Sequence, residues 1–393
     1  MKKNQTQTNK DKTKLNNTQL MKRIVNKTMA LVASLGLLSS SAIAGEGATS
    51  DSNTFEDLWD IPHLYSNPDS FWLTDLKLVG RAQWQMADVS SDLPDFSTNE
   101  IRRMRLGSEA KILGGDYKVK AEFNIDHGSG NDHYSEEVYI QYGGDALPFK
   151  VTLGLQKPKW SYEWSTSSRK ILTFERSQIV NQLAPKKTAG LNISGSIDAY
   201  DYSLGVYRGD TIHSSKGGAI FGDGDAAGEF MIASIGSSYE TAMFDSAEWR
   251  LDWLHNTDAD SNAAKPYENS FSLNHSAKQG AWGLHTDLIY AQGDAGNDDK
   301  AAIVILPTYD LSDQLQLVAR YTLADGDGLK PNKRYEAKSG AQNGDGYQSI
   351  YMGLNYYLND HKLKLMGGIE YSDMDGGNDF DGYTIFSGVR FYF

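Results

Sequence analysis

The sequence predicts an all-β fold, a transmembrane antiparallel β-barrel of about sixteen strands with an inward-folding constriction loop. Three observations lead to this prediction: an export signal near the start, a two-residue alternation of apolar and polar side chains through most of the chain, and an aromatic last strand. Such alternation is typical of a wall between lipid and water. Because backbone groups in lipid must pair internally, a sheet that spans a membrane has to close on itself.

Residues 1–44 are predicted to be a cleaved signal peptide. Basic residues between Lys22 and Lys27 precede the apolar run Met29–Leu38, and Ala42-Ile43-Ala44 offers a small-residue cleavage site. The apolar run is shorter than the roughly 20 residues that a membrane-spanning helix needs. Residues 1–20 are polar, which fits either a start codon assigned too far upstream, with Met21 as the true start, or a disordered extension.

Composition narrows the classes of function. Removing residues 1–44 takes away eight of the 38 basic residues and one of the 51 acidic residues, so the mature chain has a formal charge near −20. This surplus argues against nucleic acid as a partner, because neutralising phosphates needs a concentrated basic surface. The chain has no cysteine, which excludes thiol catalysis. No linker divides the rest, which favours a lead-in over residues 45–70 and one barrel over 71–393.

The alternation is clearest in two neighbouring segments, 101–112 and 116–126. Both place apolar side chains at every second position with charged or amide residues between them. Only Ile101 and Arg102, at the start of the first segment, fall out of phase. The pair Gly114-Gly115 between the segments predicts a tight hairpin, since glycine supplies the positive φ that such turns need.

Counting such segments gives about sixteen strands, an even number as in single-chain bacterial barrels. Their predicted starts lie near Phe71, Ile101, Asp116, Glu136, Phe149, Thr188, Asp201, Glu229, Asp245, Glu268, Ala281, Lys300, Asp313, Tyr347, Lys362 and Asp381. Short connections are expected at the periplasmic end, for example 199–201 and 359–361. Longer connections are expected to face outward, and they are 222–228, 256–265, 293–299, 324–346 and 372–381.

The last strand, Tyr383–Phe393, places aromatic and aliphatic residues on the lipid side and ends on an aromatic residue. This pattern resembles the C-terminal assembly signal of outer-membrane barrels, with Phe391 and Phe393 as its residues. It predicts recognition by the barrel-assembly machinery. Together with the signal peptide, it predicts a location in the outer membrane of a Gram-negative bacterium, with outer-membrane lipid around the barrel.

The polar face of the early strands is basic although the mature chain is acidic. The residues predicted to line the pore and to bind anions are Arg103, Arg105, Lys111, Lys118, Lys120 and Lys150. Cations along a confined pore attract anions, because the low-dielectric wall focuses their field. The alternative is that Glu109, Glu122 and Glu137 pair with these cations and cancel much of the field.

The stretch 157–176 lacks alternation and combines aromatic with charged residues. In a barrel of this width such a loop can fold inward and narrow the channel. The basic residues of this predicted constriction loop are Lys157, Lys159, Arg169, Lys170 and Arg176, of which the last three are expected to set selectivity. The alternative is an extracellular loop with scattered charges.

Several of these segments resemble the phosphate-selective porin O and P family. The resemblance rests on Ile101–Gly107 with the hairpin to Asp116–Lys120, on Gly154–Pro158, and on the short sequences Thr166–Ser168 and Phe174–Ser177. It is specific mainly over residues 101–180. It implies a sixteen-stranded barrel that forms a homotrimer, in a family whose best-studied members pass phosphate or polyphosphate. The later strands here lack a comparable basic ladder, so the resemblance defines the family more firmly than the solute.

Three further segments carry weaker signals. Asp126–His133 could hold a metal ion, but ligands so close together in a glycine-rich loop lack rigid support, which favours a polar hairpin. Asp373–Asp381 could bind Ca²⁺ through oxygen ligands, yet it matches no EF-hand spacing and fits a solvated loop. The segment Phe55–Asp69 either folds against the periplasmic mouth or is a flexible lead-in. No cofactor or resident metal is expected.

The predicted function is passive diffusion of small hydrophilic solutes, in particular anions such as phosphate, and its rival is a non-selective general porin. An outer-membrane hydrolase on a barrel scaffold would need Ser, His and a carboxylate brought together. No Gly-x-Ser-x-Gly sequence occurs, and no catalytic residue is assigned. A structural or adhesive barrel would need a plug domain to fill so wide a lumen, and the sequence offers none.

Overall fold

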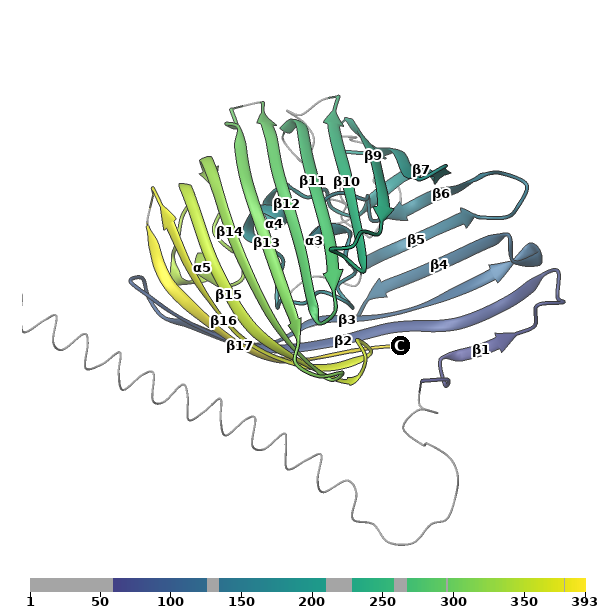
Figure 1. Ribbon diagram of the computed structural model, residues 1–393, viewed down its shortest axis with the longest axis horizontal. Helices are drawn as coiled ribbons and strands as arrows, with labels where there is room; N and C mark the ends of the chain where they lie inside the picture. The colour runs from purple at the N-terminus through teal and green to yellow at the C-terminus, as the bar shows by residue number, and fades with distance from the viewer. Residues whose placement is uncertain (1–58, 126–133, 210–227, 258–266, 295, 378) are drawn as a thin grey trace, which may run out of the picture. The chain divides into compact units, whose positions relative to one another are not determined.

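A closed ring of sixteen antiparallel strands forms the barrel (Figure 1). The structure, a computed structural model, describes residues 59–125, 134–209, 228–257, 267–294, 296–377 and 379–393. Each strand from β2 to β17 pairs with the next, and β17 pairs back onto β2, which closes the sheet. The predicted fold class is therefore confirmed. The predicted signal peptide lies outside the described residues.

The strands cover most of the chain. They are β1 (His63–Ser66), β2 (Leu73–Ser91), β3 (Phe96–Ile112), β4 (Tyr117–Asn124), β5 (Tyr134–Tyr142), β6 (Phe149–Gln156), β7 (Thr188–Ile197), β8 (Tyr200–Arg208), β9 (Glu229–Tyr239), β10 (Ser246–Asn256), β11 (Tyr267–Gln279), β12 (Trp282–Gly293), β13 (Lys300–Asp310), β14 (Leu315–Leu329), β15 (Gly344–Asn359), β16 (Leu363–Asp375) and β17 (Phe380–Tyr392). Most predicted starts agree within about three residues. The loop predicted over 324–346 is shorter, because β14 continues to Leu329 and β15 begins at Gly344.

The phase error at the start of the second predicted strand has a structural cause. Strand β3 begins five residues earlier than predicted, at Phe96, and contains a β-bulge. Gln83 of β2 lies opposite Arg103, whereas the next residue, Trp84, lies opposite Ile101, so Arg102 is an extra residue without a partner. A bulge of this kind lets the alternation resume on its far side.

The two ends of the barrel differ in the length of their connections. One end carries turns such as Leu113–Gly115, where Gly114 and Gly115 have φ values of 72° and 94°, as the hairpin prediction required. The other end carries the longest described connections, residues 157–187 and 330–343. The second of these contains the short helix α5 (Glu336–Ser339). Among the described residues, no helix is long and apolar enough to cross a membrane.

Strand β2 extends beyond the end of β17, and the short strand β1 pairs with its free edge there. Pairing with β17 runs only as far as Arg81 of β2, while β1 pairs with residues 75–77. The backbone of Phe393 exchanges two hydrogen bonds with Gly80, whose missing Cβ leaves room for the Phe393 ring. Trp59 packs on the ring of Phe391 at 5.5 Å between centroids. Residues 59–66, the part of the lead-in with these contacts, therefore lie against the seam of the barrel at its short-turn end.

Candidate functional site in the barrel lumen

The connection between β6 and β7, residues 157–187, lies inside the barrel and is called the inner loop below. Side chains from three distant strands donate hydrogen bonds to its backbone: Gln83 of β2 to Ser168 at 2.7 Å, Arg250 of β10 to Ser161 at 2.9 Å, and Asn355 of β15 to Leu172 at 2.9 Å. Its helices α3 (Tyr162–Ser165) and α4 (Gln178–Leu183) are drawn behind the strands in Figure 1. The loop folds inward as predicted, but it runs eleven residues further, to Lys187.

One side of the inner loop is apolar and packs on the inner wall. Ile179, Val180 and Leu183 of α4 are fully buried, in one cluster with inward-facing residues of β12 to β17. Phe174 stacks on Phe386 of β17 at 5.0 Å between ring centroids. Burial of such side chains stabilises the loop by about 1.5–3 kcal/mol each. Apolar packing therefore contributes to holding the loop against this part of the wall.

One buried arginine, Arg320, binds the loop to the wall within that apolar contact. The Arg320 guanidinium of β14 is 2% exposed and donates to the Glu163 carboxylate and the Glu175 carbonyl at 2.8 and 2.7 Å. Its other terminal nitrogen donates to Glu370 of β16 at 2.8 Å. Arg320 thus joins two separate points of the loop to the barrel wall.

The opposite side of the loop faces charged strands, where one carboxylate serves several cations. Glu122 of β4 is fully buried and lies 2.5 Å from Arg81, 3.4 Å from Arg169 and 3.5 Å from Lys120. Arg81 also donates to the Ser168 hydroxyl of the loop at 2.6 Å. Three cations therefore surround one anion at this point.

The next two carboxylates are shared in the same way. Lys187, at the end of the inner loop, lies 2.7 Å from Glu136 and 3.1 Å from Glu137. Glu136 also pairs with Arg105, and Glu137 also pairs with Lys120. Burial lowers the pKa of Lys187, although the neighbouring Glu136 opposes this shift. Two predicted pore residues, Arg105 and Lys120, thus lie in this cluster.

The fourth carboxylate, Glu175, belongs to the loop itself. Arg102 binds it through two nitrogens, and Arg103 approaches it to 3.9 Å while donating to Gln83 at 2.8 Å. Burial alone would raise the pKa of Glu175, but Arg102 and Arg103 hold it well below its usual range. The bulge at Arg102 is what brings two consecutive arginines to this one carboxylate.

Two loop cations flank one aromatic ring. The Lys157 ammonium lies 5.0 Å and the Arg176 guanidinium 5.2 Å from the ring centroid of Trp164. Both also donate to the carbonyl of Thr166, at 2.9 and 2.8 Å. Burial lowers the pKa of Arg176 to about 10, so it stays charged at neutral pH. Burial also lowers the pKa of Lys157 well below its usual range, and Arg176 adds to this shift.

The other predicted cations lie apart from these clusters. Lys118 faces the ring of Tyr139 at 5.5 Å, and within the described part of the chain Lys111 and Lys150 are exposed and form no ion pair. Lys159 and Lys170 are exposed on the loop. Glu109 pairs with Lys77 at 3.1 Å and not with a predicted pore residue.

Sequence reasoning missed several members of the site. Arg81, Lys187 and Arg320 were not assigned, and Arg102 was noted only as out of phase. Arg81 and Arg320 follow the inward phase of their strands and could have been found by extending the alternation of those strands. Nothing in the local sequence marks Lys187, because its role depends on how the inner loop ends.

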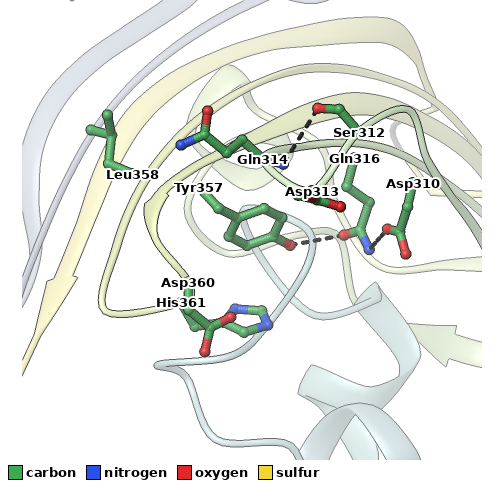
Figure 2. Close-up of a pocket in the computed structure, with 9 residues that line it drawn as sticks. All are labelled: Asp310, Ser312, Asp313, Gln314, Gln316, Tyr357, Leu358, Asp360 and His361. Atoms are coloured by element: carbon green, nitrogen blue, oxygen red, sulfur yellow. Dashed lines mark hydrogen bonds between the residues drawn. The ribbon is translucent and has the colours of Figure 1, made fainter.

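An acidic pocket of about 370 Å³ lies at the short-turn end, between the β13–β14 and β15–β16 turns (Figure 2). It is lined by three carboxylates, Asp310, Asp313 and Asp360. Tyr357 donates to Gln316 at 2.8 Å, and Gln316 donates to Asp310 at 2.9 Å. This part of the mouth therefore has the opposite charge to the wall formed by β3 and β4.

The two weaker loop signals remain predictions. The candidate metal loop Asp126–His133 and residue 378 of the candidate Ca²⁺ loop lie outside the described residues. Within the part of the chain that is described, no group of three or more His, Asp or Glu side chains is arranged to hold a metal ion.

Comparisons with known proteins agree with this architecture. The sequence profile of the family described as phosphate-selective porin O and P matches residues 76–297, more than half of the chain. No protein of curated function matches the sequence.

Several solved structures share this fold. An anion-selective porin from Comamonas acidovorans is 14% identical, with a TM-score of 0.57 over 81% of this chain and 99% of that one. OprB of Pseudomonas putida is 11% identical, with a TM-score of 0.60 over 87% and 96%. The trimer form of OmpT of Vibrio cholerae is 13% identical, with a TM-score of 0.54 over 81% and 99%. At these identities the likeness shows the fold.

Proposed function

The chain belongs to the phosphate-selective porin O and P family and forms a channel in the Gram-negative outer membrane, and from this premise we propose that its narrow zone prefers small anions to cations. The observation that carries the proposal is the sharing of carboxylates. Around the inner loop each of Glu122, Glu136, Glu137 and Glu175 contacts two or three cations. Seven different cations make these contacts with the four carboxylates, so the local charge is positive although the mature chain is acidic.

The alternative is that glutamates cancel this field, and the sharing of carboxylates supports incomplete cancellation. Glu122 and Glu137 do pair with predicted pore cations, but the cations around them outnumber the carboxylates. The field of the surplus is screened less inside a narrow lumen than on an open surface. Exposed Lys111 and Lys150 add charge that no carboxylate of the described chain neutralises. Phosphate is a candidate solute because the best-studied members of the family pass phosphate or polyphosphate.

The rival is a general porin without ion preference. The acidic pocket at the β13–β16 turns supports this rival, because carboxylates at a mouth attract cations. The balance depends on which group of charges lies closer to the path of the solute. We place the inner loop and its charged wall at the narrowest point, since this loop crosses the lumen.

Reversal potentials across a planar bilayer in a KCl gradient test the proposal. We expect the wild-type channel to prefer chloride, and we expect Lys111→Glu with Lys150→Glu to shift the potential toward cation preference. The matched control, Lys111→Arg with Lys150→Arg, keeps both charges and should leave the potential unchanged. Charge reversal of Arg103, Arg105 and Lys120 should shift the potential further, although these residues also hold the wall together. Cation preference in the wild type would overturn the proposal.

We also propose that the barrel assembles as a homotrimer. The family resemblance supports this assembly, and a trimer form is described for OmpT of Vibrio cholerae, a structural neighbour. The mass of the protein in detergent, measured by light scattering with correction for bound detergent, should equal three chains. A mass of one chain would contradict it.

A further inference from the structure

Two fully buried basic side chains lie side by side behind the inner loop. Lys364 of β16 is directly opposite Arg390 of β17, and their exposed fractions are 0% and 1%. Residues opposite each other in an antiparallel pair have their Cβ atoms about 4.5–5.5 Å apart. Among the described residues neither side chain forms an ion pair with a carboxylate, unlike Arg81 or Arg320.

The hydrogen bonds of Arg390 are incomplete. Its Nη2 donates to the Gln85 side chain at 2.6 Å and to the Phe174 carbonyl at 3.2 Å. Its Nε and Nη1 are buried without a hydrogen-bond partner. A guanidinium carries five N–H groups, of which Nε and Nη1 hold three. Buried donors are rarely left without an acceptor, and charged ones least of all.

Lys364 is held in the same place by the same loop. Its ammonium donates to the Ile171 carbonyl at 2.5 Å and contacts His361 Nδ1 at 3.4 Å. An ammonium has three N–H groups, so one remains beyond these two contacts. Burial lowers the pKa of His361 to about 4, so its ring is neutral at pH 7 and adds no positive charge.

No nearby carboxylate is free to neutralise the pair. Glu175 influences Arg390 from the loop, but its two oxygens are engaged by Arg102. Asp360 lies on the β15–β16 turn, is exposed, and makes no ion pair with Lys364 among the described residues. Arg390 cannot become neutral by losing its proton, because guanidinium groups stay charged in proteins.

We propose that a small inorganic anion, such as chloride, is bound between Arg390 and Lys364 as their counter-ion. It would accept the N–H groups of Arg390 that have no partner and the remaining N–H of Lys364. Because the carbonyls of Ile171 and Phe174 are bonded to the same two cations, the anion would also fix this part of the inner loop to the wall. The site is buried and therefore separate from conduction, and it does not depend on the proposed anion preference.

Bromide provides a direct test. The protein is refolded into detergent and crystallised in sodium bromide, and anomalous diffraction locates the heavier halide. We expect an anomalous peak in contact with both the Arg390 guanidinium and the Lys364 ammonium. A map with only water, or with no anomalous peak, at this position would overturn the proposal, even if bromide is found elsewhere in the lumen.

A solution measurement tests the same site in variants. An anion that binds only the folded state raises the melting temperature as its concentration rises. At constant ionic strength, replacing gluconate by chloride should raise the melting temperature of the wild type, and this increase should be lost in Lys364→Met. The control is Lys300→Met, since Lys300 is also buried but donates to the carbonyls of Asp298 and Asp327.

The outcomes separate this site from the proposed function. If Lys364→Met retains the full chloride effect, the counter-ion proposal is wrong. If the variant does not fold, the bromide experiment on the wild type still decides. A channel that prefers cations but shows the bromide peak would overturn the proposed anion preference and leave the counter-ion site standing.

Discussion

The two halves of the lumen wall contact the inner loop through different kinds of side chains. Strands β12 to β17 contribute many apolar side chains to the cluster that contains Phe174 and helix α4, with a few buried charges such as Arg320 among them, whereas β2 to β5 present arginines, lysines and shared glutamates. The apolar half therefore holds the loop by core packing together with a few buried polar contacts, and the charged half carries most of the shared ion pairs. The difference shows how a loop can cross a water-filled lumen and stay fixed: one face is packed like a protein core, which leaves the other free to carry charge.

The largest effect is expected from Arg320→Met, which removes the buried ion pairs that link the inner loop to the apolar half of the wall. The change leaves Glu163 and Glu370 buried without their shared cation, and breaking a buried ion pair in this way costs about 3–5 kcal/mol. We expect a lower melting temperature and larger current fluctuations in single-channel recordings, because the loop loses a link to the wall.

Arg334→Met is the matched control for that prediction. Arg334 pairs with Glu100 at 2.7 Å, but its side chain is 36% exposed, so we expect a loss of only about 0–1 kcal/mol. If both variants melt at the same temperature and conduct alike, Arg320 does not hold the loop.

A smaller effect on stability is expected from Glu137→Gln, which removes the charge of one shared carboxylate in the charged half. Lys120 and Lys187 each keep another carboxylate, Glu122 and Glu136, so the loss should stay near the ~1.5–3 kcal/mol of hydrogen bonds to charged groups. The reversal potential should move toward stronger anion preference. Glu137→Asp keeps the charge and serves as the control; an equal shift in both variants would mean that geometry and not charge sets the potential.

The smallest effect concerns pH and the β14–β15 connection. Burial raises the pKa of Glu336 from 4.5 to about 6, although the backbone N–H of Asn332 opposes the shift. The folded protein therefore binds more protons than the unfolded chain between these values, and stability falls as pH rises from about 4.5 to about 6. The loss is about 2 kcal/mol from the shift in pKa.

Glu336→Gln mimics the protonated carboxyl and should remove this pH dependence. Melting temperatures between pH 4 and pH 7 measure it, with Glu240→Gln, an exposed glutamate in the β9–β10 turn, as the control. A variant that keeps the full wild-type slope would show that Glu336 is not the group responsible.

The sequence predicted the barrel because strand alternation is local and repeats sixteen times. It also indicated the inner loop, since residues 157–176 lack alternation and carry Trp160, Trp164 and Phe174 together. It did not reveal how far the loop extends or that an apolar cluster of the wall packs beneath it. Those features depend on contacts between residues more than 100 positions apart, such as Arg320 with Glu163.

Charge pairing was the least predictable part of the site. The sequence indicated only that Glu109, Glu122 and Glu137 could pair with the predicted pore cations as a group, without saying which residues would meet. It did not indicate that Lys187 shares Glu136 and Glu137, since that contact depends on the path of the loop back to the wall. Short strand β1 was missed because a four-residue strand is too brief to show alternation.

Because Arg102 is the extra residue of a β-bulge, this position can lose one residue without changing the alternation of the rest of the strand. A one-residue deletion in a regular strand moves every following side chain to the opposite face of the sheet, so that lumen-facing polar residues would face lipid. A membrane-spanning strand cannot tolerate this change. Deleting Arg102 would instead join Ile101 to Arg103 in the regular alternation. Such a shortened protein should still insert and close, and it would lose one of the two arginines at Glu175 without any substitution.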